Sequence, residues 1–252
     1  MENMERLSRR DFSAQTLGSL VTFSLLESLF ASDAFGGAIK PLTTQWLAQL
    51  SQLSGDLKGR KLKQIEWQAQ VESLMAQVDL GDVLRFIDFD KLTRGISFKE
   101  QGEQSLRIAF PQVEGLPTNL VFGHQLFALR KGNSVVPHGH DNMATAFLIL
   151  QGDFHGRHYD RLEDDREFMV IRPTIDRKFS SAEYSTVSDF KDNVHWFKTL
   201  SETGFIFNIH VLSVKPGRSG RVYVDPDGEQ LSGGRIRARK FKSAAEAYKR
   251  FG

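Results

Sequence analysis

The 252-residue sequence contains no cysteine. This absence excludes disulfide frameworks, zinc–thiolate sites, iron–sulfur clusters and any cysteine nucleophile. A metal ion would therefore have to be held by histidine, aspartate, glutamate or backbone groups. A charge excess is lacking as well, since 33 Lys and Arg residues oppose 31 Asp and Glu residues and leave a formal net charge of +2. The composition therefore gives no support for nucleic acid as a partner.

The sequence also lacks an apolar run that would form a stable membrane span. The mildly apolar run Thr16–Phe30 is too short for one and contains Glu27. It follows Ser8–Phe12, which reads Ser-Arg-Arg-Asp-Phe, and precedes the small residues Ser32–Ala34. This order resembles a twin-arginine export signal with its small-x-small cleavage site. Residues 1–34 are therefore predicted to be a signal for export to the periplasm, and the alternative is an amphipathic N-terminal helix of a cytoplasmic protein.

The region after this segment has a helical period. In residues 41–91, Leu47, Leu50 and Leu53 recur at three-residue steps, and a second apolar stripe begins at Trp67. Such stripes indicate packing between helices rather than ligand binding. We therefore predict a helical segment over residues 41–91.

After Gly95 the pattern changes to short β-branched and aromatic runs separated by Pro, Gly and Asp. Many short strands at this spacing predict a sandwich, barrel or jelly roll, which we assign to residues 95–225. The clearest runs are Leu120–Leu129, Thr145–Leu150, Phe168–Ile171 and Phe205–Val214.

Residues 226–252 are predicted to be a basic C-terminal tail. Lys and Arg recur through Arg235–Arg250, and Ser243–Arg250 favours a helix. Spaced basic residues on a terminal helix are typical of a solvated face, and no aromatic residues alternate with them to stack on bases. The tail therefore adds no support for a nucleic-acid partner.

The segment Gly132–Gly152 carries the most informative pattern. His138 and His140 are two residues apart, and on a strand such residues point to the same face and can reach one metal ion. Pro137 fixes the backbone at the start of this strand, and Gly139 lets the backbone approach closely. The alternative interpretation is a pair of solvent-exposed loop histidines.

The spacing resembles the first motif of the cupin family, Gly-x5-His-x-His-x3–4-Glu-x6-Gly. Gly132, His138, His140 and Gly152 stand at matching positions, whereas Thr145 occupies the glutamate position. The resemblance implies a mainly β fold, the cupin double-stranded β-helix or jelly-roll barrel, preceded by an N-terminal α-helical segment. It also implies a metal ion in the mouth of the barrel, with one ligand still to be found.

His195 is the candidate for that missing ligand. It ends the segment Asn193–His195, and the second cupin motif supplies one histidine from a comparable later strand. Three neutral imidazoles leave coordination positions open and suit Fe(II), with Ni, Cu or Zn as alternatives. The alternative for His195 itself is a half-buried strand histidine beside Trp196.

A narrower resemblance links the chain to the thiol dioxygenases of the cysteamine dioxygenase and plant cysteine oxidase family. The His-x-His-x-x-Met part of the family pattern Pro-x-His-x-His-x-x-Met matches His138–Met143, with Pro137 directly before the first histidine, and the family's later Tyr-Asp pair matches Tyr159–Asp160. Its third iron ligand stands in an Asn-x-His segment, here Asn193–His195, and its later Gly-Arg pair corresponds to Gly220–Arg221. The resemblance implies Fe(II) on three histidines and oxidation of a thiol by O2.

Two positions depart from that family. The aspartate that follows the third ligand becomes Asn208, and the Pro-Pro-Tyr segment becomes Lys215–Gly217, without tyrosine. Apolar residues alternate along Phe205–Val211, so Asn208 and His210 share the other face of that strand. We therefore predict Asn208 and His210 as catalytic candidates, with solvent exposure of this face as the alternative.

The remaining histidines carry weaker indications. His155 and His158 flank a turn and are assigned to the surface or to the surroundings of the site rather than to the ligand set. His124 gives no indication of function.

Together these observations predict an exported, metal-binding cupin with His138, His140 and His195 as ligands. The leading hypothesis is a mononuclear non-heme Fe(II) dioxygenase of the thiol-dioxygenase type, whose partners are O2 and a small-molecule substrate. One alternative is another metal-dependent cupin enzyme, such as an isomerase, a decarboxylase or a non-thiol dioxygenase. The other is a cupin that binds a metal or small ligand without turnover.

Overall fold

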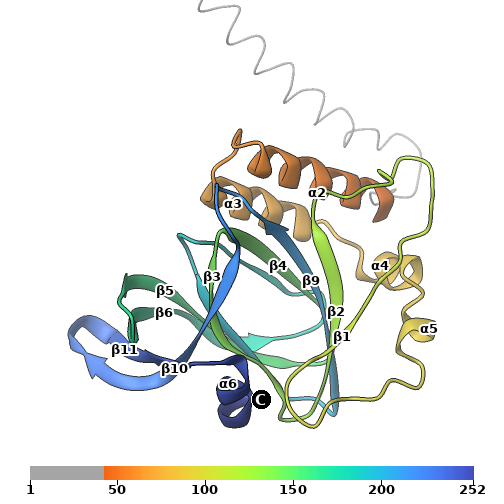
Figure 1. The fold of residues 1–252 in the computed structure, drawn as a ribbon. Helices are drawn as coiled ribbons and strands as arrows, with labels where there is room; N and C mark the ends of the chain where they lie inside the picture. The colour runs from red at the N-terminus through yellow and green to blue at the C-terminus, as the bar shows by residue number, and fades with distance from the viewer. Residues whose placement is uncertain (1–42) are drawn as a thin grey trace, which may run out of the picture. The chain divides into compact units, whose positions relative to one another are not determined.

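The computed structural model describes residues 43–252, which Figure 1 draws in colour. The predicted export signal over residues 1–34 lies outside the described residues. The described elements are, in order, α2 (Thr43–Lys58), α3 (Gln64–Met75), α4 (Leu80–Phe86), α5 (Phe89–Thr93), β1 (Gln104–Leu106), β2 (Gly123–Arg130), β3 (Ser134–Asp141), β4 (Met143–Gln151), β5 (Phe154–Asp164), β6 (Phe168–Phe179), β7 (Tyr184–Val187), β8 (Val194–Thr199), β9 (Thr203–Leu212), β10 (Gly220–Leu231), η1 (Ser232–Gly234), β11 (Arg235–Lys240) and α6 (Ala244–Phe251).

The helices α2 and α3 correspond to the two apolar stripes in the sequence. α2 buries Trp46 and Leu50, and the Trp46 indole Nε1 donates a hydrogen bond to the Leu74 carbonyl oxygen of α3 over 3.1 Å. Both helices cover one face of the sheet that contains β4 and β9, and their apolar side chains share one core with that face (Figure 1). Within residues 43–252, no helix combines the length and the apolar character needed to cross a bilayer.

The strands form two antiparallel sheets. One sheet has the order β1-β2-β9-β4-β7, and the other closes into a barrel in the order β10-β11-β6-β5-β8-β3. Residues from both sheets, among them Phe127, Phe147 and Phe197, form the core between them. The predicted mainly β jelly-roll barrel is therefore confirmed.

The barrel extends further along the chain than the predicted residues 95–225. β10 continues past Asp225, and β11 pairs with both β10 and β6. In β11, Ile236 and Ala238 are buried, whereas the arginines that alternate with them are not. The basic residues of this segment therefore occupy one face of a strand, and the helix that follows is α6.

β9 shows how alternation assigns side chains to the two sides of a sheet. Phe205, Phe207 and Ile209 belong to the core shared with the helices, whereas Ile206 belongs to the core between the sheets. Because side chains of a strand alternate between faces, Asn208 follows Ile206 to the inner side. This places an amide near the metal-ligand candidates of the facing sheet.

Two glycines of the histidine motif differ in the space around them. Gly132 and Gly152 both have positive φ angles, +86° and +84°. A Cβ atom on Gly152 would lie 2.5 Å from the Thr203 carbonyl oxygen, whereas a Cβ atom on Gly132 would meet nothing within 4 Å. Alanine at Gly132 therefore has only backbone strain to overcome, and alanine at Gly152 must also displace backbone atoms.

We expect Gly152→Ala to lower the free energy of unfolding by about 3 kcal/mol and Gly132→Ala to lower it by about 1 kcal/mol. Both substitutions put a β-carbon into the left-handed region, so their difference isolates the contact with Thr203. Urea unfolding of the two variants measures it. Equal losses of stability would contradict this explanation.

Candidate metal centre

Two neighbouring strands carry the three ligand candidates. β3 contributes His138 and His140, and β8 contributes His195. The strands are antiparallel, and His138 stands directly opposite His195. Residues two apart on a strand and residues paired across strands share a face of the sheet. The register therefore brings all three imidazoles to the same side.

The three rings converge on one point. His140 Nε2 lies 3.2 Å from His138 Nε2 and 3.3 Å from His195 Nε2. The three ligand atoms all lie within 4.8 Å of one another. Two nitrogens that bind one ion at about 2.1 Å, at right angles, are roughly 3 Å apart. The spacing therefore fits a possible metal site.

Neighbouring acceptors determine which ring nitrogen is free to bind. His138 Nδ1 donates to the Val136 carbonyl oxygen over 2.8 Å, which leaves Nε2 of the neutral ring without a proton. His140 Nδ1 lies 3.2 Å from the Thr145 hydroxyl, which can accept its proton in the same way. Thr145, at the position of the cupin glutamate, therefore orients a ligand ring.

Asn193 connects the two ligand strands. Its Nδ2 donates to the His140 and Ser188 carbonyl oxygens over 2.8 and 2.9 Å. A Cβ atom on Gly139 would lie 2.8 Å from Asn193 Oδ1, so this approach requires glycine. The Asn-x-His segment thus has a physical role, because the asparagine holds the backbone of one candidate ligand and His195 supplies another.

Burial keeps the three rings uncharged at neutral pH. The exposed fractions of His138, His140 and His195 are 4%, 2% and 1%. Burial, with a smaller contribution from the positive charge of Arg221, lowers the pKa of His138 to about 3. Burial also lowers the pKa of His140 and of His195 well below the usual histidine value. Neutral imidazole is the form that binds metal ions.

A small cavity adjoins the three histidines. It offers about 10 Å³ for the centre of a water-sized sphere, which suits one ion or one water molecule. Asn208 lines it, is 2% exposed, and has an Nδ2 atom without a hydrogen-bond partner among the described residues. The complete lining is Glu103, Phe127, Val135, His138, His140, Phe147, His195, Asn208 and Arg221.

His210, the other catalytic candidate, is not part of this lining. It is half-buried on β9 and stands opposite Gly123 of β2. The structure therefore brings Asn208, but not His210, to the cavity wall.

Two residues of the cavity region were missed in the sequence. Glu103 is 9% exposed, and its Oε1 accepts a hydrogen bond from the Tyr248 hydroxyl of α6 over 2.8 Å. Burial raises the pKa of Glu103, against the opposing effect of that hydrogen bond. No local pattern marks either residue, because their contact joins positions that are 145 residues apart.

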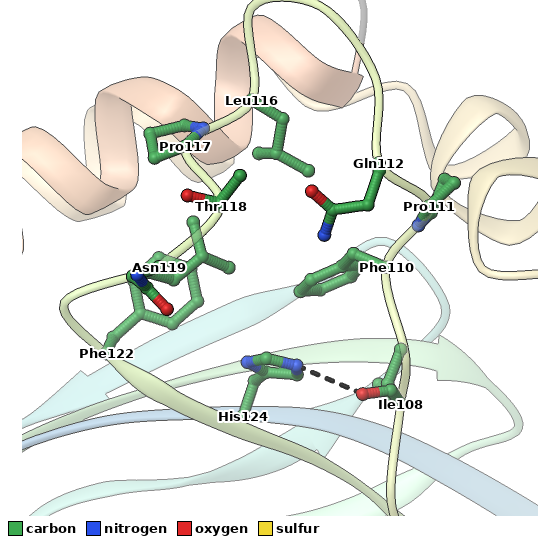
Figure 2. Close-up of a pocket in the computed structure, with 11 residues that line it drawn as sticks. Ile108, Phe110, Pro111, Gln112, Leu116, Pro117, Thr118, Asn119, Phe122 and His124 are labelled. Atoms are coloured by element: carbon green, nitrogen blue, oxygen red, sulfur yellow. Dashed lines mark hydrogen bonds between the residues drawn. The ribbon is translucent and has the colours of Figure 1, made fainter.

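A larger pocket of about 290 Å³ shares no lining residue with this cavity. Figure 2 shows His124 at its base, beneath Phe110 and Gln112. His124 Nε2 donates to the Ile108 carbonyl oxygen over 3.2 Å.

His155 lies elsewhere, near the surface, where its Nε2 contacts the Asp176 carboxylate. Neither histidine joins the converging group.

Of the two locations expected for His158, the surface and the surroundings of the site, the structure shows the second, and His155 and His158 lie within one strand rather than on either side of a turn. His158 stands on β5 directly opposite His195 and is fully buried between Phe179 and Phe197. Neither ring nitrogen has a hydrogen-bond partner among residues 43–252. Burial lowers the pKa of His158 to about 3.

His158→Leu is expected to make the metal-free protein less sensitive to acid. Between the unfolded and folded pKa values of His158, the unfolded chain binds a proton that the native state does not, so stability falls as the pH falls. The free energy of unfolding should fall less between pH 7 and pH 5 in the variant than in the wild type. The expected difference between the two falls is about 2 kcal/mol. Urea unfolding at both pH values measures the effect. An unchanged loss would contradict the depressed pKa.

No family model and no curated protein matches the sequence. Among solved structures, a cupin superfamily protein from Desulfitobacterium hafniense is 18% identical, with a TM-score of 0.30, over 46% of this chain and 84% of that chain. A conserved protein with a double-stranded beta-helix domain from Klebsiella pneumoniae is 11% identical, with a TM-score of 0.30, over 40% of this chain and 69% of that chain.

Procruciferin, an 11S globulin from Brassica napus, is 11% identical, with a TM-score of 0.31, over 41% of this chain. The match spans 23% of the procruciferin chain. Similarities this low do not indicate what the chain does. Cupin proteins are thus among the structural neighbours of a chain whose own strands form a double-stranded β-helix barrel with three buried, converging histidines.

Proposed function

We propose that the protein is a mononuclear non-heme iron dioxygenase of the thiol-dioxygenase type, which uses O2 to oxidise a small molecule or thiol. The observation that supports it most is the convergence of three neutral imidazoles, with His140 Nε2 3.2 and 3.3 Å from the other two nitrogens. Three imidazoles without a carboxylate in the ligand set leave coordination positions open.

The residues present fit such an ion. Each ligand nitrogen is buried, two of the rings are oriented through Nδ1, and cysteine thiolates that would favour a different metal are absent from the sequence. Bound Fe(II) would supply the open positions for O2 and substrate and the electrons for dioxygen chemistry.

The chain itself would bind and orient the reactants. Phe127 and Phe147 give the cavity an apolar wall against which a bound molecule can pack. Asn208 Nδ2 can donate a hydrogen bond to a molecule in the cavity, but an amide cannot take up a proton at neutral pH. Asn208 is therefore proposed to position a bound molecule rather than to act as its acid or base.

A second candidate is a cupin that binds a metal ion without turnover. The cavity volume of about 10 Å³ favours it, because one ion or one water molecule fills that space and a substrate enters only if side chains move. A metal-dependent cupin enzyme with a different reaction is the remaining alternative.

Metal analysis of anaerobically purified protein, followed by oxygen-uptake assays with a panel of small thiols, tests the proposal. The expected result is about one Fe(II) per chain and oxygen uptake that depends on both Fe(II) and a thiol. Metal binding without oxygen uptake for any thiol would support the second candidate. Protein that binds no metal would rule out both.

A further inference from the structure

Glu103 is a buried carboxylate on the wall of the metal cavity that the proposed function does not use. It stands just before β1 and is 9% exposed. Tyr248 donates a hydrogen bond to its Oε1 over 2.8 Å, whereas its Oε2 is buried and has no hydrogen-bond partner among residues 43–252. Burying a carboxylate oxygen without a hydrogen bond costs free energy. This cost indicates that a hydrogen-bond donor occupies the cavity when the site is filled.

The surroundings hold this carboxylate in position. A Cβ atom on Gly102 would overlap the Tyr248 ring, so the backbone next to Glu103 lies directly against α6. Asn133 Nδ2 donates to the Lys99 and Gly102 carbonyl oxygens over 3.1 and 3.2 Å. Because Asn133 immediately precedes β3, the loop that carries Glu103 is fixed to the strand that carries two of the histidines.

α6 is anchored independently of Glu103. Arg250 forms an ion pair with Asp225 of β10 at 2.9 Å, and the Phe251 ring lies 5.1 Å from the Trp196 ring of β8. Burial and the nearby Glu103 charge raise the pKa of Tyr248, so its hydroxyl remains protonated and keeps donating. Glu103 Oε2 is therefore the carboxylate oxygen that remains available.

Three lining residues have a buried polar atom without a hydrogen-bond partner among residues 43–252: His195 Nδ1 in a candidate ligand ring, the acceptor Glu103 Oε2 and the donor Asn208 Nδ2. The Glu103 carboxylate is not part of the group of ligand atoms that lie within 4.8 Å of one another. Glu103 is therefore placed to contact a molecule bound at the histidines rather than to serve as a fourth metal ligand.

We propose that Glu103 contacts the molecule held at the three histidines and accepts a hydrogen bond from an O–H, N–H or S–H group of it. Tyr248 is the positioning residue, because it occupies one carboxylate oxygen and leaves the other for the ligand. The site then favours small polar molecules that present a hydrogen-bond donor to Glu103, while Arg221 places a positive charge on the same cavity wall.

This inference rests on the metal site of the proposed function but not on its dioxygenase chemistry. Protein loaded with Co(II) therefore tests it at a pH above the pKa of the hydrazinium ion, with azide as an anion without hydrogen and hydrazine as a neutral N–H donor. Visible absorption reports the affinity of each probe without any turnover. Glu103→Gln keeps the shape of the side chain, and its amide oxygen can still accept from Tyr248 while its NH2 group faces the cavity.

Glu103→Gln is expected to weaken hydrazine binding by about tenfold and to strengthen azide binding by about tenfold, since an acceptor becomes a donor and a negative charge is removed. Tyr248→Phe should weaken hydrazine binding by a smaller factor. Glu100→Gln is the matched control, because this exposed residue of the same loop undergoes the same chemical change outside the cavity. The control should change neither affinity.

Unchanged affinities in Glu103→Gln, or affinities that shift in the same direction, would overturn the role of Glu103 and leave the metal site standing. Wild-type protein that binds no Co(II) would overturn both. If Glu103→Gln does not fold, Tyr248→Phe decides the question, and unchanged affinity for hydrazine in that variant overturns the inference.

Discussion

Replacing His195 with alanine is expected to lower the affinity for Fe(II) by more than about 100-fold. Loss of a residue that only hydrogen-bonds to a metal ligand typically lowers metal affinity by about 10- to 100-fold, and loss of a ligand itself should have a larger effect. The β8 side chain supplies one of three nitrogens, and the remaining pair, 3.2 Å apart on β3, would hold the ion alone. Metal content after anaerobic purification and dialysis measures the loss.

His155→Ala is the matched control for this experiment. His155 lies near the surface, where its Nε2 contacts the Asp176 carboxylate, and it does not belong to the converging group. The control should keep the wild-type metal content. Equal metal content in both variants would mean that the ion, if bound, is held elsewhere.

Asn208→Asp is expected to raise thiol-dependent oxygen uptake by about 100-fold while leaving the metal content unchanged. The change restores an ionisable group at the position where the thiol dioxygenases that the sequence resembles have an aspartate. The side chain lines the cavity and is 2% exposed, so the new carboxylate would stand beside the bound molecule. Oxygen-electrode assays with the thiol panel give the rate.

Asn119→Asp, an exposed amide outside this cavity, controls for the change in charge. Its rate should equal that of the wild type. Brisk thiol oxidation by the wild-type protein would show that an aspartate is not required here. If neither variant takes up oxygen, non-thiol chemistry or metal binding without turnover becomes the better hypothesis.

The strand register around the histidines could be predicted because it depends on local spacing. His138 and His140 share a face through the two-residue period of a strand, and alternation along β9 separates Asn208 from the apolar residues facing the helices. The extent of the barrel was harder to predict. In β11 the arginines dominate the composition, which predicts a basic tail, although Ile236 and Ala238 are buried in the barrel.

The Glu103–Tyr248 contact could not be predicted, because neither residue stands in a pattern. Their approach depends on the turn before β3, on the packing of α6 against β8 and β10, and on the close contact at Gly102. The burial of His158 could not be predicted for a related reason. Its burial follows from the pairing of β5 with both β6 and β8, which one short segment of sequence does not reveal.

The span of the Glu103–Tyr248 hydrogen bond has a consequence for the order in which the protein is built. The bond joins residues 145 positions apart, and every strand of the barrel lies between them. His138, His140 and His195 all leave the ribosome before α6 is made. The hydrogen bond from Tyr248 that positions the Glu103 carboxylate can therefore form only after all three imidazoles are present in the chain.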